Sequence, residues 1–146
     1  MPEASTSSKR TWVADVELTI PFYDLDPLEV VWHGNYAKYF ERARCAVLDV
    51  VSYNYAEMKA SGYAWPVIDM HVRFLQPLTF GQVIVVHAEI VEWEHWLKLH
   101  YVIRDKTTGV RLTTGTTRQV AVDLETKLMS LQSPAVLFER LGVLQP

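Results

Sequence analysis

The segment from Asn35 to Val51 is the feature that most constrains the fold of this chain. Its apolar side chains recur at steps of three and four residues, which predicts a helix of about 16 residues with one broad apolar face. Most of the remaining chain reads as strands, so this helix can bury its apolar face only against the concave face of a sheet. The sequence therefore predicts an α+β fold with one central helix. The predicted apolar face comprises Tyr36, Tyr39, Phe40, Ala43, Val47, Val50 and Val51, and Lys38, Glu41, Arg42 and Arg44 are expected on the opposite side.

The other elements follow from alternation and from turn residues. Apolar and polar residues alternate, or apolar residues dominate, in five stretches that we predict to be antiparallel strands. Two shorter helices are expected, one ended by Gly62 and one that begins with Ser133 as the N-cap and Pro134 as the first helical residue. Asn35 is the expected N-cap of the long helix. The strands fall at 12–20, 65–74, 82–93, 97–103 and 110–123, with an extension at 127–130.

Composition excludes several classes of function. The 146 residues fit one domain, predicted at 12–146 after a flexible tail at 1–11. A net charge of -3 without a basic block argues against nucleic acid as a partner. The single cysteine, Cys45, rules out an intramolecular disulfide and is expected to be a packing residue. With no secretory segment and no apolar stretch near the roughly 20 residues of a membrane span, a cytoplasmic protein is expected, with no membrane partner.

Common catalytic motifs are absent from the sequence. It has no glycine-rich nucleotide loop and no nucleophile elbow, and its five histidines lack the spacing of a zinc site. We therefore predict neither a cofactor nor a metal.

The stretch DLDPLEVVWHGNYAKYFERAR, which begins at Asp24, admits two interpretations. Asp-Pro is a common start of a turn, and Asp24 is able to cap backbone amides, so the acids are simply loop residues in the first interpretation. In the second, the first N–H groups of the following helix stabilise a carbonyl oxygen that becomes negatively charged, which is worth about 2.7–4 kcal/mol per donor in a dry site. A carboxylate placed opposite would then attack that carbonyl or activate a water.

This stretch resembles the active-site segment of the 4-hydroxybenzoyl-CoA thioesterase family of hot-dog enzymes, including the YbgC-like acyl-CoA thioesterases. The likeness rests on the D-x-D pair, the apolar pair Val30-Val31, the aromatic-His pair Trp32-His33, the Asn35-Tyr36 pair and the run FERAR. Downstream, MHVRFLQPLTFGQ and TTGTTRQVAVD resemble two strands of the family. The resemblance covers about residues 14 to 130.

The resemblance implies a hot-dog fold, in which an antiparallel sheet of about five strands wraps around the long helix, and a homodimer or homotetramer. It implies hydrolysis of acyl-CoA thioesters, with Asp26 as catalytic nucleophile or general base and the backbone N–H of His33 as oxyanion donor. The imidazole of His33 would orient Asp26 or a water, and Asp24 would organise the loop. Leu28 and Glu29 depart from the family, which has a small residue and a glycine there; Glu29 is therefore an alternative base.

Substrate-binding residues are less sharply defined by the sequence. Tyr23, Trp32 and Trp65 are candidate walls of the acyl pocket. Arg73, Arg104, Arg111 and Arg118 are candidate partners for the phosphates of coenzyme A. Two alternatives stay open: a thioesterase that acts on acyl groups carried by an acyl carrier protein, and a non-catalytic acyl-binding partner in a biosynthetic assembly.

Overall fold

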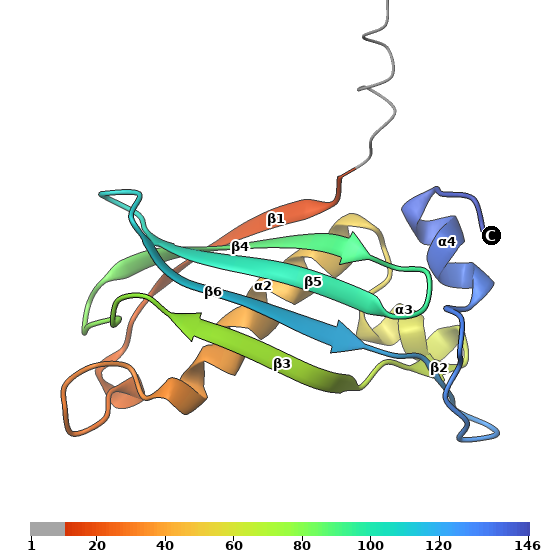
Figure 1. The fold of residues 1–146 in the computed structure, drawn as a ribbon, viewed down its shortest axis with the longest axis horizontal. Helices are drawn as coiled ribbons and strands as arrows, with labels where there is room; N and C mark the ends of the chain where they lie inside the picture. The colour runs from red at the N-terminus through yellow and green to blue at the C-terminus, as the bar shows by residue number, and fades with distance from the viewer. Residues whose placement is uncertain (1–10) are drawn as a thin grey trace, which may run out of the picture.

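The largest element of the fold is an antiparallel sheet of five strands (Figure 1). The structure is a computed structural model that describes residues 11–146. The predicted tail thus lies, apart from Thr11, outside the described residues. The number of strands agrees with the expectation. In spatial order they are β1 (Val13–Thr19), β4 (Val83–Glu92), β5 (Leu97–Asp105), β6 (Arg111–Gln119) and β3 (Val67–Phe74).

The strand predicted at 110–123 is interrupted near its end. β6 ends at Gln119, the buried residues Val120 and Ala121 belong to no strand, and the next two residues pair with another strand. They form β7 (Val122–Asp123), which pairs with β2 (Tyr63–Ala64) in a separate two-stranded sheet. The apolar run of Val120, Ala121 and Val122 follows directly on β6, so the sequence pattern does not reveal the interruption.

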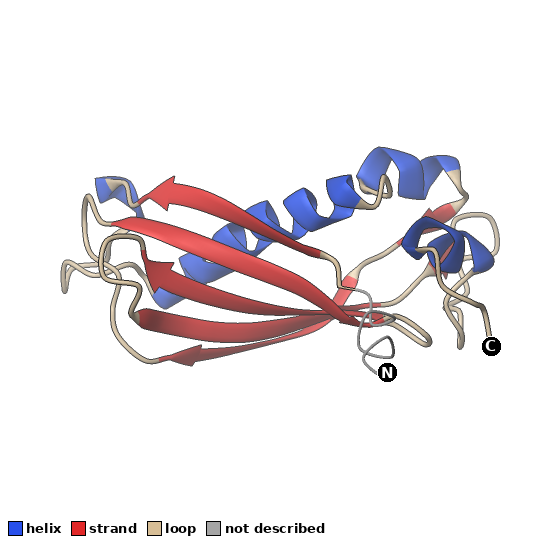
Figure 2. Ribbon diagram, turned by 90° about the horizontal axis from the view of Figure 1, so that it is seen from above, coloured by secondary structure: helices blue, strands red, loops and turns tan. Residues whose placement is uncertain are grey.

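The long helix α2 (Tyr36–Val50) lies along the concave face of the sheet (Figure 2). Short 3₁₀ helices η1 (Phe22–Asp24) and η2 (His33–Asn35) precede it. The helix α3 (Tyr55–Ala60) begins with a capping box, in which Asn54 and Glu57 exchange hydrogen bonds between side chain and backbone. The last helix, α4 (Ala135–Leu141), has Pro134 at its N-cap, because Pro134 is extended (φ -67°, ψ 155°); the prediction of Ser133 as the N-cap is wrong.

Phe40 packs α2 against the sheet. Its ring stacks on Tyr101 of β5, with ring centroids 4.4 Å apart and an interplanar angle of 11°. The ring also lies over Gly115 of β6, where a Cβ atom would come within 2.6 Å of it. Gly115 thus allows close approach of helix and sheet, a packing role that glycine serves in strands.

Two residues of α2 lie on faces that the helical pattern did not predict. Val50, in the last turn, is 61% exposed although Val47 and Val51 are buried, so it lies on the solvent side of the helix. Arg44, predicted on the polar face, is buried. Its guanidinium donates hydrogen bonds to the hydroxyls of Tyr101 and Tyr55 and pairs with Glu41. A buried charge needs such partners, and these tie α2 to both the sheet and α3.

β3 is an edge strand whose side chains are mostly exposed. It pairs on one side with β6, and seven of its eight residues fall in the exposed class. Apolar residues are among them: Val67, Ile68, Met70 and Phe74 are each 43–50% exposed. An exposed apolar edge is a template for pairing with another chain. Among residues 11–146, no helix is both long and apolar enough to cross a membrane.

We predict that Gly115→Ala lowers the free energy of unfolding by about 1–3 kcal/mol, because the new methyl group overlaps the ring of Phe40 and the carbonyl oxygen of His71. Urea denaturation of the variant measures this loss. In a Phe40→Leu background, where the ring is gone, the same substitution should cost clearly less. An equal cost in both backgrounds would contradict the packing role of Gly115.

Candidate active site

The loop before the central helix is a short hairpin built around Asp26 and Pro27. The N–H of Asp26 donates to the carbonyl of Val30 (2.8 Å), and the N–H of Glu29 donates to the carbonyl of Asp26 (2.9 Å). Asp followed by Pro favours the first two positions of such a turn. Glu29 has a φ of 65°, the left-handed conformation that glycine favours. The chain therefore keeps a turn suited to glycine although Glu29 occupies the position.

The carboxylate of Asp26 takes part in this turn. Its Oδ1 accepts a hydrogen bond from the N–H of Leu28 (2.8 Å), as an aspartate at the start of a turn commonly does. Asp26 is half-buried, and no hydrogen bond to its Oδ2 is found among residues 11–146. The first interpretation of the sequence, a turn residue, thus describes one oxygen of Asp26 and leaves the other available for chemistry.

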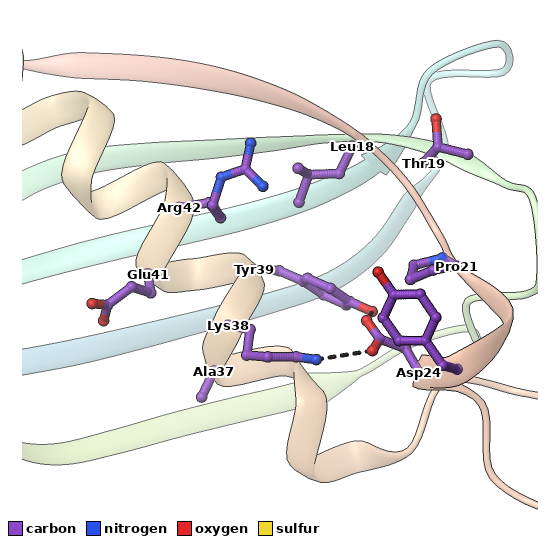
Figure 3. A pocket seen from close by; sticks show the side chains of 10 residues that line it. Leu18, Thr19, Pro21, Asp24, Ala37, Lys38, Tyr39, Glu41 and Arg42 are labelled. Carbon is purple, nitrogen blue, oxygen red and sulfur yellow. Dashed lines mark hydrogen bonds and ion pairs between the residues drawn. The ribbon is translucent and has the colours of Figure 1, made fainter.

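Asp24 is buried and holds the hairpin onto the helix (Figure 3). Its Oδ1 accepts from the ammonium of Lys38 (2.8 Å), and its Oδ2 accepts from the hydroxyl of Tyr39 (2.6 Å). Burial works to raise the pKa of Asp24, but these hydrogen bonds and the charge of Lys38 outweigh it and hold the pKa below its ordinary value. The pKa of Tyr39 is strongly raised by burial and by the facing carboxylate.

The start of the helical region is fixed by the backbone of the same residue. The carbonyl of Asp24 accepts hydrogen bonds from the N–H of Trp32 (3.0 Å) and from the side-chain amide of Asn35 (2.8 Å). Asn35 stands at the N-cap of α2 as predicted, but its side chain makes no cap hydrogen bond, because it is directed to Asp24. In the described part of the chain, no acceptor is found for the N–H groups of His33 and Gly34.

Two cavities flank this region. The first, called here the entrance cavity, has a volume of about 230 Å³. The second, called the β1 groove, has about 590 Å³ and is the space drawn in Figure 3. The entrance cavity is lined by Val30, Val31, His33, Tyr36, Phe74, Leu75, Gln76 and Pro77; the β1 groove by Leu18, Thr19, Pro21, Tyr23, Asp24, Ala37, Lys38, Tyr39, Glu41 and Arg42.

The residues predicted for the active site do not all lie around one cavity of a single chain. Trp32 and His33 are adjacent, with ring centroids 5.2 Å apart, and His33 lines the entrance cavity. Tyr23 is 74% exposed and lines the β1 groove, whereas Trp65 is buried beside β2. Asp26 lines neither of the two cavities.

Sequence reasoning missed the two partners of the Asp24 carboxylate and the aromatic wall of the entrance cavity. Lys38 and Tyr39 lie 14 and 15 residues beyond Asp24, so no local pattern links them. Phe74, at the end of β3, contacts the ring of Tyr36 edge to face, with centroids 4.8 Å apart. Its only sequence signal is the downstream stretch MHVRFLQPLTFGQ, which contains it.

The cations proposed for phosphate binding differ in their surroundings. Arg118 is committed to Asp69, to which its Nε donates (2.7 Å), and its guanidinium lies 4.6 Å from the ring centroid of Trp96. The other three, Arg73, Arg104 and Arg111, are exposed. Within residues 11–146, no group of three or more His, Cys, Asp or Glu side chains is placed to hold a metal ion.

A five-stranded antiparallel sheet wrapped around one long helix is the hot-dog architecture. The family comparison agrees: the model of the Thioesterase-like superfamily matches residues 20–140, so the chain belongs to that superfamily and is a thioester hydrolase. This confirms the predicted fold and enzyme class; the YbgC-like branch stays a prediction.

Individual relatives point the same way. YneP of Bacillus subtilis, provisionally assigned as an acyl-CoA thioesterase, is 25% identical over 113 residues, 77% of this chain and 82% of YneP. ATL3, a chloroplast acyl-acyl carrier protein thioesterase of Arabidopsis thaliana, is 36% identical over 76 residues, 52% of this chain and 40% of ATL3. The structure of DHNA-CoA thioesterase from Staphylococcus aureus has the same fold, with a TM-score of 0.74 and 24% identity over 80% of this chain and 78% of that chain.

We predict that Asp24→Asn destabilises the protein by about 2 kcal/mol at neutral pH, because charged hydrogen bonds are lost. The folded-state pKa of Asp24 is lowered, so its contribution is fully present above the unfolded pKa of about 3.9 and is lost as pH falls through the lower folded value. Chemical denaturation between pH 7 and pH 3 should therefore show the difference between variant and wild type shrinking below about pH 4. The exposed Glu29→Gln serves as control. A difference that does not change with pH would contradict the assignment.

Proposed function

We propose that this protein hydrolyses acyl-CoA thioesters at the start of the central helical region, with Asp26 as the catalytic carboxylate. The observation that carries the proposal is the pair of helix-start N–H groups without an acceptor, those of His33 and Gly34, which follow directly on the Asp26 hairpin. The thioester carbonyl oxygen binds against the N–H of His33, where it meets the positive end of the helical region.

The reaction adds water across the C–S bond. Either the ionised Asp26 attacks the carbonyl carbon, expels the thiolate and leaves a mixed anhydride that water then hydrolyses, or Asp26 takes a proton from the water that attacks. In both routes the negative charge on the carbonyl oxygen is stabilised by the same N–H, and the products are a carboxylic acid and a thiol. The His33 imidazole orients Asp26 or the water.

The fixed position of the hairpin supports this role for Asp26, because both the side chain and the backbone of Asp24 hold the hairpin against the helical region. Asp24 binds the helix through Lys38 and Tyr39, and its carbonyl binds Trp32 and Asn35. Precise placement of a reacting group is worth several kcal/mol in catalysis. A non-catalytic acyl-binding protein, the alternative, would not require a carboxylate held in a fixed position.

The carrier of the acyl group has a second candidate. The identity to ATL3 supports an acyl carrier protein as the donor, whereas YneP supports coenzyme A. Both donors present the same phosphopantetheine thioester, so the chemistry at Asp26 is unchanged. Comparing the rate of thiol release from an acyl-CoA and from the same acyl group on a purified carrier protein separates them.

We also propose that two copies of the chain pair through β3. Within residues 11–146, the outer edge of β3 pairs with no other strand, and its exposed apolar residues would be covered by a second copy. Such a dimer would close the entrance cavity, because Phe74 at the end of β3 is part of its lining. Light scattering should give the mass of a dimer or a multiple of it; a monomer at micromolar concentration would contradict the pairing.

The direct test of function is thiol release from a panel of short, long and aromatic acyl-CoAs, followed with a thiol dye. Turnover of at least part of the panel is expected. If the purified protein releases no thiol from any acyl-CoA or acyl carrier protein thioester, the proposed function is wrong.

We predict that Asp26→Asn lowers kcat by at least about 100-fold, because the amide is neither nucleophile nor base. Glu29→Gly is the matched change in the same turn: it should leave kcat within about threefold and raise the free energy of unfolding by about 0.5–1 kcal/mol, since glycine tolerates the φ of 65°. Steady-state kinetics and urea denaturation measure both. Activity that survives Asp26→Asn but fails in Glu29→Gly would identify Glu29 as the base.

A further inference from the structure

The β1 groove is the larger of the two cavities beside the active site. Its volume of about 590 Å³ lies within the range of small-molecule sites. One wall is the edge strand β1, and the other is formed by the first two turns of α2. The proposed reaction does not take place there, because His33 lines the entrance cavity and Asp26 lines neither cavity. The groove is therefore free to hold a ligand of its own.

The walls of the β1 groove are largely apolar, because α2 does not cover β1 completely. Val16 and Leu18, on the face of β1 turned toward the core, are only half-buried. Their partners in the ladder with β4, Val86 and Ile84, are fully buried. Ala37, on the helix side of the groove, is exposed. An uncovered apolar wall of this kind is typical of a groove that binds an apolar ligand.

The charged groups that line the groove are paired, with one exception. The ammonium of Lys38 binds the buried carboxylate of Asp24 at 2.8 Å. The carboxylate of Glu41 pairs with the buried guanidinium of Arg44. Among residues 11–146, no acceptor and no carboxylate is found for the guanidinium of Arg42. The groove therefore carries one uncompensated positive charge.

Arg42 is placed to hold an anion beside the apolar wall (Figure 3). Its side chain extends from α2 toward Leu18 of β1, whereas that of Glu41 extends away from β1. The two carboxylates of β1, Asp15 and Glu17, lie on the opposite face of the strand from Leu18, because side chains alternate along it. The planar fork of a guanidinium matches the two oxygens of a carboxylate.

We propose that the β1 groove binds a free carboxylic acid with an apolar chain, with the carboxylate on Arg42 and the chain between β1 and α2. One uncompensated positive charge suits a monoanion, and the apolar walls suit the chain. Hydrolysis of an acyl thioester releases an acid of this class. That the ligand is a product of the enzyme itself rests on the proposed function, whereas the site does not.

A second copy of the chain fits the groove less well than such an acid. Lys38, Glu41 and Arg42 are exposed around it, and a protein surface laid over them would remove these charged groups from water. A single apolar chain enters the groove and leaves the charged groups at its rim in contact with water. The fatty acid therefore accounts better for a groove that is both apolar and rimmed by charge.

Calorimetry with decanoate, below its micelle concentration, tests the role of Arg42. We expect Arg42→Gln to bind decanoate at least tenfold more weakly than the wild type, because the ion pair with the carboxylate is lost. Arg104→Gln is the matched control, since Arg104 is exposed and lies outside the lining. Its affinity for decanoate should equal that of the wild type. Equal affinity in the wild type and Arg42→Gln overturns the assignment.

The two parts of the ligand are tested separately. Each buried methylene raises affinity about fourfold, so hexanoate should bind at least tenfold more weakly than decanoate. 1-Decanol has the chain without the charge and should bind the wild type no more tightly than Arg42→Gln binds decanoate. Affinity that depends on neither the chain nor the charge would contradict the proposed binding mode.

Filling the groove tests its location. Ala37→Trp places a large ring in the lining and should lower the affinity for decanoate at least tenfold, whereas Ala56→Trp, at an exposed position of α3 outside the lining, should not. If Ala37→Trp leaves decanoate binding intact but changes the mass in light scattering, the groove is an interface between copies of the chain and the inference is overturned.

Competition separates the β1 groove from the active site. A non-hydrolysable decanoyl-CoA thioether, which binds the active site under the proposed function, should leave the affinity for decanoate within about threefold. Displacement of decanoate by the thioether would place the acid in the active site and overturn the inference. A protein that binds decanoate through Arg42 but releases no thiol from any thioester would refute only the catalytic proposal.

Discussion

The carboxylate of Asp24 is the interaction on which the arrangement of the site depends. It lies buried between Lys38 and Tyr39 of the central helix, and the carbonyl of the same residue binds Trp32 and Asn35. A buried charge persists only where it is paired, so this residue can be satisfied only when hairpin and helix are docked together. The position of the hairpin is therefore coupled to folding of the helix. Asp26 lies in this hairpin, two residues after Asp24, so its position depends on the same contacts.

The helix in turn is positioned by close packing on the sheet. Phe40 fits between Tyr101 and the bare backbone of Gly115, and Arg44 binds Tyr101 from the next turn of the helix. Rigid placement of this kind matters for an enzyme whose proposed oxyanion donor is a backbone N–H, since that group moves only with the helical region that carries it.

The sequence predicted the long helix and the five main strands, because both periodicities are strong wherever one face is buried. The sequence-based predictions failed where burial or strand pairing depends on contacts between residues distant in the chain. Arg44 was predicted on the polar face because its partners Tyr101 and Tyr55 are distant in the chain, and the apolar run after Gln119 hides the change of pairing partner. For the site, the motif led to Asp26 and His33, but the lining of a cavity depends on how strands are ordered, which one sequence does not show. Trp65 illustrates this: predicted as a wall of the same pocket, it directly follows β2, which lies at the opposite end of the sheet from the Asp26 hairpin (Figure 1).

The central claim is that negative charge developing on the thioester oxygen is stabilised at the helix start beside Asp26. The most direct test compares two non-hydrolysable acyl-CoA analogues by calorimetry. One is a thioether, which lacks the carbonyl oxygen. The other is a trifluoromethyl ketone, whose carbonyl carbon adds a nucleophile or water to give a tetrahedral adduct with an oxyanion. We predict that the wild type binds the ketone at least about 100-fold more tightly, as enzymes bind mimics of their transition states. Equal affinity for both analogues would contradict the account.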